Sequence, residues 1–316
     1  MVKIPTLEQA LSTVQNPSAT DRQLLIAANT LVSWGRVNMA DQVLNRLRSN
    51  PHIAREVNKL AAVSRQLRRS GVLSELAAVQ AAGKVAIGID GQHEAYMARH
   101  LGGSRKLVIV LTGLGQRFWI SLMLLHMFLR RLNTHILYLT DLRQFFFLDG
   151  LETIAKGYGE LLQALRGAVQ ELNVDDVHVL ANSAGGFAGL RYAMDLKAKS
   201  FLGLSIPTDL SGSLPVARLL TRDEVRCVAP HMFVDLRPLV AASEWPERIM
   251  LYCGEKNPVD PLHARHLAGL PNVEITMLRN YAAHDMISGL LAQGIFEQVL
   301  HSFVGSAPVE RIAVQA

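Results

Sequence analysis

The sequence predicts an α/β protein in which an all-helical segment precedes a doubly wound, mostly parallel sheet. In residues 1–83 the apolar residues recur only at helical spacing. From residue 84 onward, short apolar runs alternate with helical patterns, which is typical of crossover connections between parallel strands. The chain of 316 residues is 49% hydrophobic and 19% charged, so it has enough apolar residues for a large buried core.

Asp21 and Asp41 stand where helix N-caps are expected. The stretch over 25–51 has a helix rich in small residues and a turn near Gly35, followed by Ala40, Leu44, Leu47 and the terminal Pro51. This helix pair resembles a tetratricopeptide repeat. A single pair lacks the stacked neighbours with which repeats bury their faces. Two interpretations therefore stay open for residues 1–83: a repeat-like interaction module, or a general helical bundle or cap.

The net charge of +5 lies entirely in this segment. Residues 1–83 hold ten Lys/Arg and five Asp/Glu, whereas the remaining 233 residues hold 22 of each sign. A basic face can bind an acidic protein, a membrane surface or nucleic acid, but a solvated arginine-rich helix has the same composition. Because no nucleic-acid motif accompanies the charge, we expect no nucleic-acid partner and keep a protein partner as an open alternative.

Cysteine usage and the N-terminus favour a cytoplasmic protein. Cys227 and Cys253 are the only cysteines, too few for a disulfide framework and typical of reduced thiols. The start MVKIPTLEQA lacks the basic residues and apolar run of a signal peptide. The most apolar stretch, residues 118–129, is too short to cross a membrane. We expect no transmembrane segment.

Strands are expected where apolar runs end in turn residues. The later runs are continuously apolar, as strands buried on both faces must be, and the first two runs are candidates for an antiparallel edge. In such a sheet the reactive groups gather at the carboxyl ends of the strands. We expect strands over residues 84–90, 93–101, 106–113, 135–141, 176–183, 200–207, 248–255 and 273–280, and helices over residues 116–131, 150–172, 185–198, 261–269 and 285–304.

The strongest chemical signal surrounds Ser183. The apolar strand over 177–182 runs into Ser183, and a helix rich in small residues begins at once. A sharp strand-to-helix turn of this kind exposes a serine hydroxyl at the edge of a sheet. The residues two positions before and after the serine must be small, because they lie against the neighbouring strand and helix. Ala181 and Gly185 meet this need.

This pattern resembles the nucleophile elbow of the α/β-hydrolase superfamily, and the resemblance covers roughly residues 84–304. It implies a serine hydrolase with Ser183 as the nucleophile, followed along the chain by an acid and then a histidine. The first glycine of the usual pentapeptide is Ala181 here, a change of one methyl group. A serine at an ordinary tight turn is the alternative interpretation.

His284 and Asp260 follow Ser183 in the order that the superfamily uses. A serine hydroxyl is a poor nucleophile until a base takes its proton, and His284, just past the last predicted strand, is the expected base. Asp260 precedes His284 by 24 residues, and a buried carboxylate there would orient the imidazole. Alternatively, Asp260 only caps the helix that follows it. Glu255 and Asp209 are alternate acids.

The resemblance also implies two backbone N–H donors for an oxyanion. One is Ala184, directly after the nucleophile, and the other is Leu114, in the turn after the strand over 106–113. Many relatives have His-Gly where this sequence has Thr112-Gly113. The glycines of this turn alternatively serve only to shape it.

Two further segments lie near the predicted active edge. Phe145 to Phe147 follow a strand and either line an acyl or aromatic pocket or pack in the core. Residues 208–246 interrupt the alternation of strands and helices, as a small cap would. The expected domains are therefore a helical segment over 1–83, a catalytic domain over 84–306 that includes this cap, and a C-terminal tail over 307–316.

We expect neither a metal nor a cofactor. His263 and His266 form an H-x-x-H pair on a helix expected to be exposed, but further metal ligands are missing. Gly113 and Gly115 lack the third glycine and the acidic residue of a dinucleotide site.

Together with the resemblance, these residues imply a serine hydrolase that acts through an acyl-enzyme. We expect a small-molecule ester or thioester as its substrate on the general ground that such leaving groups need less protonation than an amine. An acyltransferase that uses the same triad is one alternative. A non-catalytic protein that uses the hydrolase fold for binding or scaffolding is another.

Overall fold

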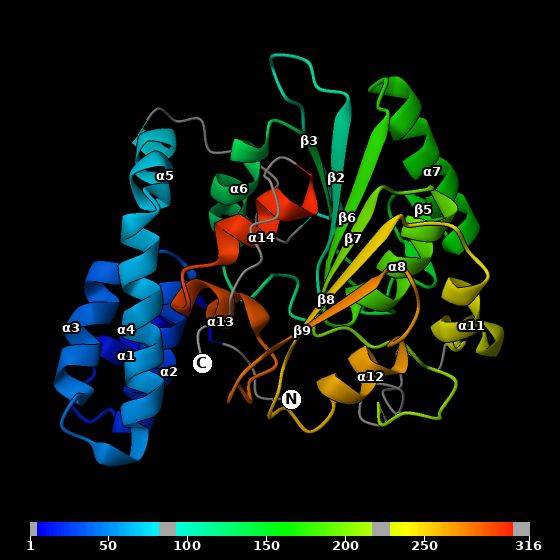
Figure 1. Cartoon of the computed structure of the whole chain (residues 1–316). Coiled ribbons are helices and arrows are strands. Elements are labelled where there is room, and N and C mark those ends of the chain that lie inside the picture. The colour runs from blue at the N-terminus through cyan, green and yellow to red at the C-terminus, as the bar shows by residue number, and fades with distance from the viewer. Residues whose placement is uncertain (1–4, 82–92, 217–227, 306–316) are drawn as a thin grey trace. The chain divides into compact units, whose positions relative to one another are not determined.

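The computed structural model describes residues 5–81, 93–216 and 228–305 (Figure 1). The strand expected over 84–90 and the expected tail over 307–316 lie outside these residues. The chain divides into two compact units: residues 1–87, 118–128 and 287–296 form one, and residues 88–117, 129–286 and 297–316 form the other. The domain boundary at residue 83 and the cap around 208–246, whose residues 217–227 are not described, stay predictions.

The first unit is helical. Helix α2 (Asp21–Ser33) is followed by Gly35, whose φ of 73° is left-handed. The Gly35 N–H donates to Val32 O at 2.9 Å, and the Arg36 N–H donates to Leu31 O at 2.8 Å. This is the Schellman ending that glycine permits after a helix. The N-terminal helices are α1 (Leu7–Gln15), α2 (Asp21–Ser33), α3 (Val37–Leu47), α4 (Ala54–Arg69) and α5 (Val72–Ala81), with a 3₁₀ turn at Pro51–Ile53.

The helix caps differ from those expected. Thr20 caps α2, because its hydroxyl accepts from the Gln23 N–H at 3.3 Å while the Gln23 side chain accepts from the Thr20 N–H at 2.8 Å. Asp21 is therefore the first helical residue rather than the cap. Asp41 lies inside α3, where it forms an ion pair with Arg68 at 2.5 Å.

Two segments from later in the chain belong to this unit, including most of α6 (Leu122–Leu129) and of α13 (Met286–Ala292). The Ser121 N–H donates to Ser33 O at 2.8 Å, and Trp119 packs against an apolar cluster. That cluster consists of Leu24, Ala28, Val43, Leu44, Leu47, Val57, Leu60 and Ala61. The helical segment thus buries its apolar face partly against residues that follow the second strand.

The second unit contains the predicted sheet. Among the described residues this sheet has seven strands, in the order β1-β3-β2-β6-β7-β8-β9. The edge strand β1 pairs antiparallel with β3, and every other pairing is parallel. This confirms the mostly parallel α/β sheet. The strands are β1 (Ala95–Ala98), β2 (Lys106–Leu111), β3 (His135–Leu139), β6 (Asp176–Asn182), β7 (Ser200–Leu204), β8 (Arg248–Gly254) and β9 (Val273–Leu278).

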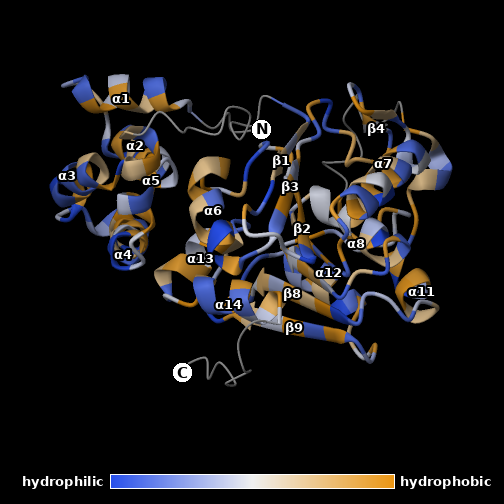
Figure 2. Ribbon diagram, turned by 90° about the horizontal axis from the view of Figure 1, so that it is seen from above, coloured by the Kyte–Doolittle hydropathy of each residue, from blue (hydrophilic) through white to orange (hydrophobic). Residues whose placement is uncertain are grey.

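Helices cover both faces of this sheet (Figure 1). Val177, Val179 and Ala181 of β6 share one apolar core with α7 (Tyr158–Glu171), α8 (Gly185–Asp195) and α11 (Leu236–Ala241). On the other face, the Ser200 hydroxyl donates to Phe303 O of α14 (Phe296–Phe303) at 2.6 Å. Both faces are covered because successive side chains of a strand point to opposite faces of the sheet. Figure 2 shows the hydrophobic residues, in orange, along the central strands.

Three expected helices are shorter than their patterns. The run over 150–172 begins with a hairpin of β4 (Gly150–Leu151) and β5 (Ala155–Lys156), and only then forms α7. The run over 285–304 is divided into α13 and α14 at Gly294, whose φ is 74°. Helix α6 begins at Leu122 rather than near 116, because Trp119 has a φ of 69°, which no right-handed helix accommodates.

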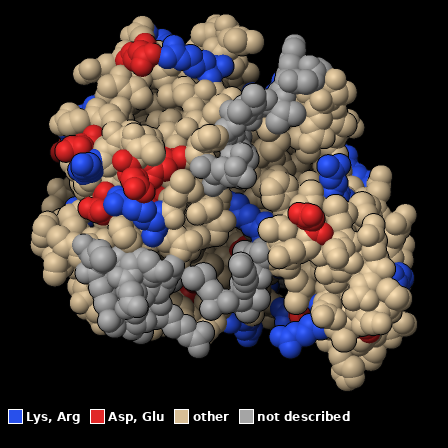
Figure 3. All heavy atoms as spheres, turned by 180° about the vertical axis from the view of Figure 1, so that it is seen from behind, with Lys and Arg blue, Asp and Glu red and all other residues tan. Residues whose placement is uncertain are grey.

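Acidic and basic side chains are intermingled on the surface. On the face in Figure 3, red and blue groups lie next to one another. Ion pairs such as Lys199–Glu247, at 2.6 Å, are part of this pattern. The prediction of a partner for the basic N-terminal segment stays a prediction. No helix in the described ranges has the length and hydrophobicity needed to cross a bilayer.

We expect the stability of the fold to depend on the buried strands. Leu202 of β7 is fully buried, whereas Leu239 of α11 is 41% exposed. Leu202→Ala should lower the free energy of unfolding by about 2–5 kcal/mol, because it removes buried methyl groups and leaves a cavity. The control Leu239→Ala should change it by less than about 0.5 kcal/mol. Urea unfolding followed by circular dichroism measures the free energy of unfolding of both variants. Equal losses in the two variants would contradict the burial of Leu202 in the core.

Candidate active site

Ser183 lies in a tight turn between β6 and α8. Its φ of 51° is left-handed, a strained conformation for a residue with a side chain. The turn is held by two backbone hydrogen bonds: the Ser183 N–H donates to Leu204 O, and the Gly186 N–H donates to Ser183 O, both at 2.9 Å. The side chain is partly exposed at the end of the strand. The predicted elbow geometry is present.

Small residues permit this turn because the end of β6 and the start of α8 lie close to the backbone that follows β2. A Cβ on Gly185 would lie 2.3 Å from Thr112 O, and a Cβ on Gly113 would lie 3.0 Å from Ser183 Cβ. Ala181 is fully buried, and its Cβ lies 2.9 Å from the position of a Cβ on Gly189. Larger side chains at these positions would push the strand end and the helix apart.

The structure brings together the three residues that the sequence analysis selected. His284 Nε2 lies 2.7 Å from Ser183 Oγ. On the other side of the ring, His284 Nδ1 lies 2.9 Å from Asp260 Oδ1 and 3.0 Å from Oδ2. The Asp260 side chain is only 7% exposed, whereas that of His284 is 52% exposed. The chain of hydrogen bonds therefore runs from a buried carboxylate to a hydroxyl that a substrate can reach.

Asp260 is the first residue of α12 (Asp260–His266), and Val259 rather than Asp260 occupies the cap position. Asn257 holds this helix start instead, because its Oδ1 accepts from the N–H groups of Val259 and Asp260, both at 2.9 Å. The Asp260 carboxylate is thereby left for His284. Of the alternate acids, Glu255 accepts from the Asn280 N–H and Asp209 accepts from Ser211.

Contacts between two loops place His284 beside Asp260. The Lys256 N–H donates to Tyr281 O at 2.8 Å, and the Asn257 side chain donates to Ala282 O at 3.3 Å. Gly254 permits this approach, since a Cβ there would lie 2.6 Å from Tyr281 O. No sequence motif predicts these contacts between the two loops. Gly254, at the end of β8, is the one residue whose type points to a close backbone approach.

The surroundings of His284 raise the pKa of its imidazole above the ordinary value of 6.5. Burial acts in the opposite direction, because it disfavours the imidazolium. The hydrogen bond and the charge of Asp260, together with the charge of Asp285, outweigh that effect. The site is thus suited to a histidine that receives and holds a proton.

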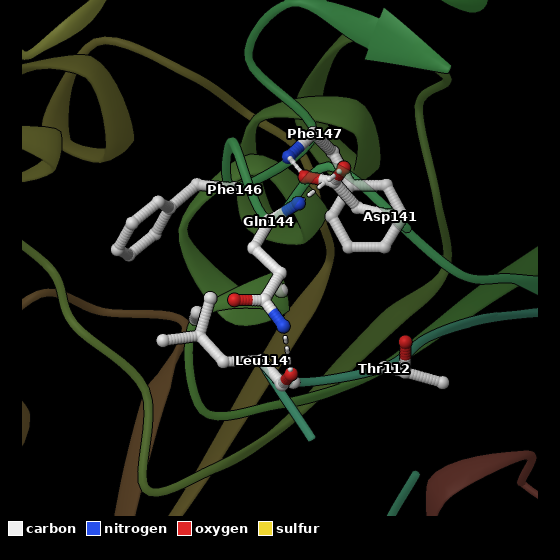
Figure 4. A pocket seen from close by; sticks show the side chains of 9 residues that line it. Thr112, Leu114, Asp141, Gln144, Phe146 and Phe147 are labelled. Carbon is white, nitrogen blue, oxygen red and sulfur yellow. Dashed lines mark hydrogen bonds between the residues drawn. The ribbon is translucent and has the colours of Figure 1, made fainter. Parts of the chain in front are cut away.

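Leu114 and Ala184, which carry the two predicted N–H donors, line one pocket. This pocket is bounded by Thr112, Gly113, Leu114, Asp141, Gln144, Phe146, Phe147, Ala184 and Gly185 (Figure 4). Within the described residues, neither the Leu114 N–H nor the Ala184 N–H donates to another group. The Thr112 hydroxyl is buried and likewise has no hydrogen-bond partner there. Donors are therefore available beside Ser183.

The loop after β3 forms the opposite wall of the pocket. Phe146 and Phe147 are buried and line the pocket. That this pocket receives an acyl or aromatic group stays a prediction. Asp141 holds the loop, because its carboxylate accepts from the N–H groups of Gln144 and Phe147, each at 2.9 Å. Burial raises the pKa of Asp141, and these backbone hydrogen bonds act against that rise. No motif in the sequence marks Asp141 or Gln144 as residues of the site.

The expectation that His263 and His266 lie on an exposed helix is wrong. His263 is buried and its Nδ1 accepts from the Thr208 N–H at 3.1 Å; burial lowers the pKa of His263 to about 4. His266 Nε2 contacts Asp235 Oδ1 at 2.7 Å. Helix α12 packs against β8 and β9, which is why its inner side is buried. In the described part of the chain, no group of three or more His, Cys, Asp or Glu side chains forms a metal site.

Neither the family models nor the curated proteins compared with this sequence match it. Solved structures do match. The 2,6-dihydroxy-pseudo-oxynicotine hydrolase aligns with a TM-score of 0.54 and 15% identity, over 94% of this chain and 92% of its own. An S-formylglutathione hydrolase from Agrobacterium tumefaciens aligns with a TM-score of 0.47 and 14% identity, over 67% of this chain and 89% of its own.

The first of these matches includes most of the helical N-terminal segment, because residues 1–83 make up about a quarter of the chain and 94% is covered. At 15% identity the likeness concerns the fold. It agrees with a mostly parallel central sheet that has flanking helices and a helical N-terminal segment. This protein has the α/β-hydrolase fold.

Proposed function

We propose that this protein is a serine hydrolase that cleaves a small-molecule ester or thioester. The observation that carries the proposal is the hydrogen-bonded series Ser183–His284–Asp260, with 2.7 Å between Ser183 Oγ and His284 Nε2 and 2.9 Å between His284 Nδ1 and Asp260 Oδ1. A nucleophile, a base and an orienting acid in this arrangement are what acyl transfer to a serine requires.

In the first half of the reaction, His284 Nε2 takes the hydroxyl proton while Ser183 Oγ attacks the carbonyl carbon. The carbonyl oxygen becomes an oxyanion, and the N–H groups of Leu114 and Ala184 stabilise it. The imidazolium then gives its proton to the leaving alcohol or thiol as the carbon–oxygen or carbon–sulfur bond breaks. The acyl group stays on Ser183 Oγ.

In the second half, a water molecule gives a proton to His284 and attacks the acyl carbon. The second oxyanion uses the same two donors, and its collapse returns the proton from His284 to Ser183 Oγ. The carboxylic acid leaves. Throughout, Asp260 keeps the His284 Nδ1–H in place and stabilises the imidazolium without taking its proton.

A fluorophosphonate probe tests the proposal, since it forms a stable adduct with an activated serine. We expect the folded protein to gain one adduct mass on Ser183 and Ser183→Ala to gain none. Ser49→Ala, at an exposed serine of the helical segment, should react like the wild type. Intact mass spectrometry with peptide mapping measures this. A folded wild type without an adduct would favour the binding or scaffold alternative.

The pH dependence of kcat/KM tests the roles of His284 and Asp260. Because the pKa of His284 is raised above 6.5, activity should fall as the pH drops through that raised value. Asp260→Asn removes the negative charge that raises the pKa of His284 and replaces the carboxylate by a neutral amide, a weaker acceptor. The acidic limb should therefore move to lower pH, and kcat should fall by about 10⁴-fold.

Glu255→Gln is the matched control for this experiment. Glu255 is exposed, and a glutamine oxygen can still accept from the Asn280 N–H. We expect its kcat to stay within about threefold of wild type. A large loss in Glu255→Gln combined with an active Asp260→Asn would assign the acid to Glu255 instead.

A further inference from the structure

The turn that carries the Leu114 N–H is held by hydrogen bonds on two sides. Within the turn, the Gln116 N–H donates to Gly113 O at 2.9 Å. From outside, Gln144 Nε2 donates to Leu114 O at 3.0 Å. Figure 4 shows the Gln144 side chain extending from its loop to the Leu114 carbonyl.

These two bonds restrain the peptide planes on both sides of the Leu114 Cα. Gly113 O and the Leu114 N–H belong to one planar peptide group, so the bond from Gln116 fixes one plane. Leu114 O belongs to the next peptide group, and the bond from Gln144 fixes that one. With both planes restrained, the direction of the Leu114 N–H is restrained as well.

The loop that presents Gln144 has an unfavourable backbone conformation. Gln144, Phe146 and Phe147 have φ values of 63°, 59° and 58°, which are costly for bulky residues. Such conformations persist only where the surroundings enforce them. Here the buried Asp141 carboxylate accepts two N–H groups from the loop, and two phenylalanine rings are packed in the pocket wall. The loop therefore presents Gln144 in a defined position.

We propose that Gln144 is a positioning residue, which holds the Leu114 peptide so that its N–H meets the oxyanion of the transition state. The inference rests on the proposed function. A donor helps catalysis only when it is aimed in advance at the place where charge develops, and a small displacement of such a group costs much of the rate.

Two substitutions separate the hydrogen bond from the packing. Gln144→Met keeps most of the side-chain volume and removes the donor, whereas Gln144→Ala removes both. Gln163→Ala, at an exposed position of α7, is the matched control. The assay uses p-nitrophenyl butyrate as substrate, together with the fluorophosphonate adduct on Ser183. An alkyl trifluoromethyl ketone, which forms an oxyanion on the enzyme, and the alcohol of the same carbon skeleton serve as inhibitors.

We expect kcat to fall about 10- to 100-fold in both Gln144 variants, with KM within about threefold of wild type. The inhibition constant of the fluoroketone should rise by the factor by which kcat/KM falls. The inhibition constant of the alcohol and the acidic limb of the pH profile should not change, because neither involves the oxyanion. Gln163→Ala should match the wild type in all of these measurements.

An active wild type combined with an equally active Gln144→Met would overturn the positioning role and leave the proposed function intact. Equal weakening of fluoroketone and alcohol would also overturn it, since that pattern indicates a collapsed pocket rather than a misdirected donor. A wild type with neither turnover nor a Ser183 adduct would overturn both proposals together.

Discussion

The parallel pairing of β6, β7, β8 and β9 is the constraint on which the candidate site depends. Parallel strands direct their carboxyl ends to the same edge of a sheet. Ser183 follows β6, Asp260 follows β8 and His284 follows β9, so residues separated by up to 101 positions become hydrogen-bonding neighbours. A change in strand order or direction would separate them even if every local motif were kept.

The same edge of the sheet concentrates close approaches and unfavourable backbone conformations. Ser183 and Gln144 are left-handed, and a Cβ on Gly185 would lie only 2.3 Å from Thr112 O. Such conformations cost stability, and they persist where surrounding contacts enforce them. At this site the enforcing contacts are the backbone bonds around Ser183 and the buried carboxylate of Asp141. The result is a hydroxyl, an imidazole and free N–H donors that are arranged before any substrate binds, which is the condition for electrostatic stabilisation of a transition state.

Local patterns were most informative where one physical requirement dominates. Continuous apolar runs predicted the strands, because a strand buried on both faces has no polar position. The small residues Ala181 and Gly185 pointed to Ser183, because a tight strand-to-helix turn excludes larger ones. Helix limits were predicted less well. The start of α6 depends on the left-handed Trp119, and burial of His263 depends on packing of α12 against the sheet; neither leaves a local signature.

Local apolar patterns and strand ends were sufficient to predict the α/β class, the candidate nucleophile and the order of the candidate acid and histidine. Contacts in the folded chain identify Asp260, rather than Glu255 or Asp209, as the carboxylate beside His284. Contacts of the same kind bring the loop of Asp141 and Gln144 to the turn at Leu114, and residues 118–128 to the N-terminal helices. Such contacts join segments far apart in the chain, and no local pattern encodes their geometry.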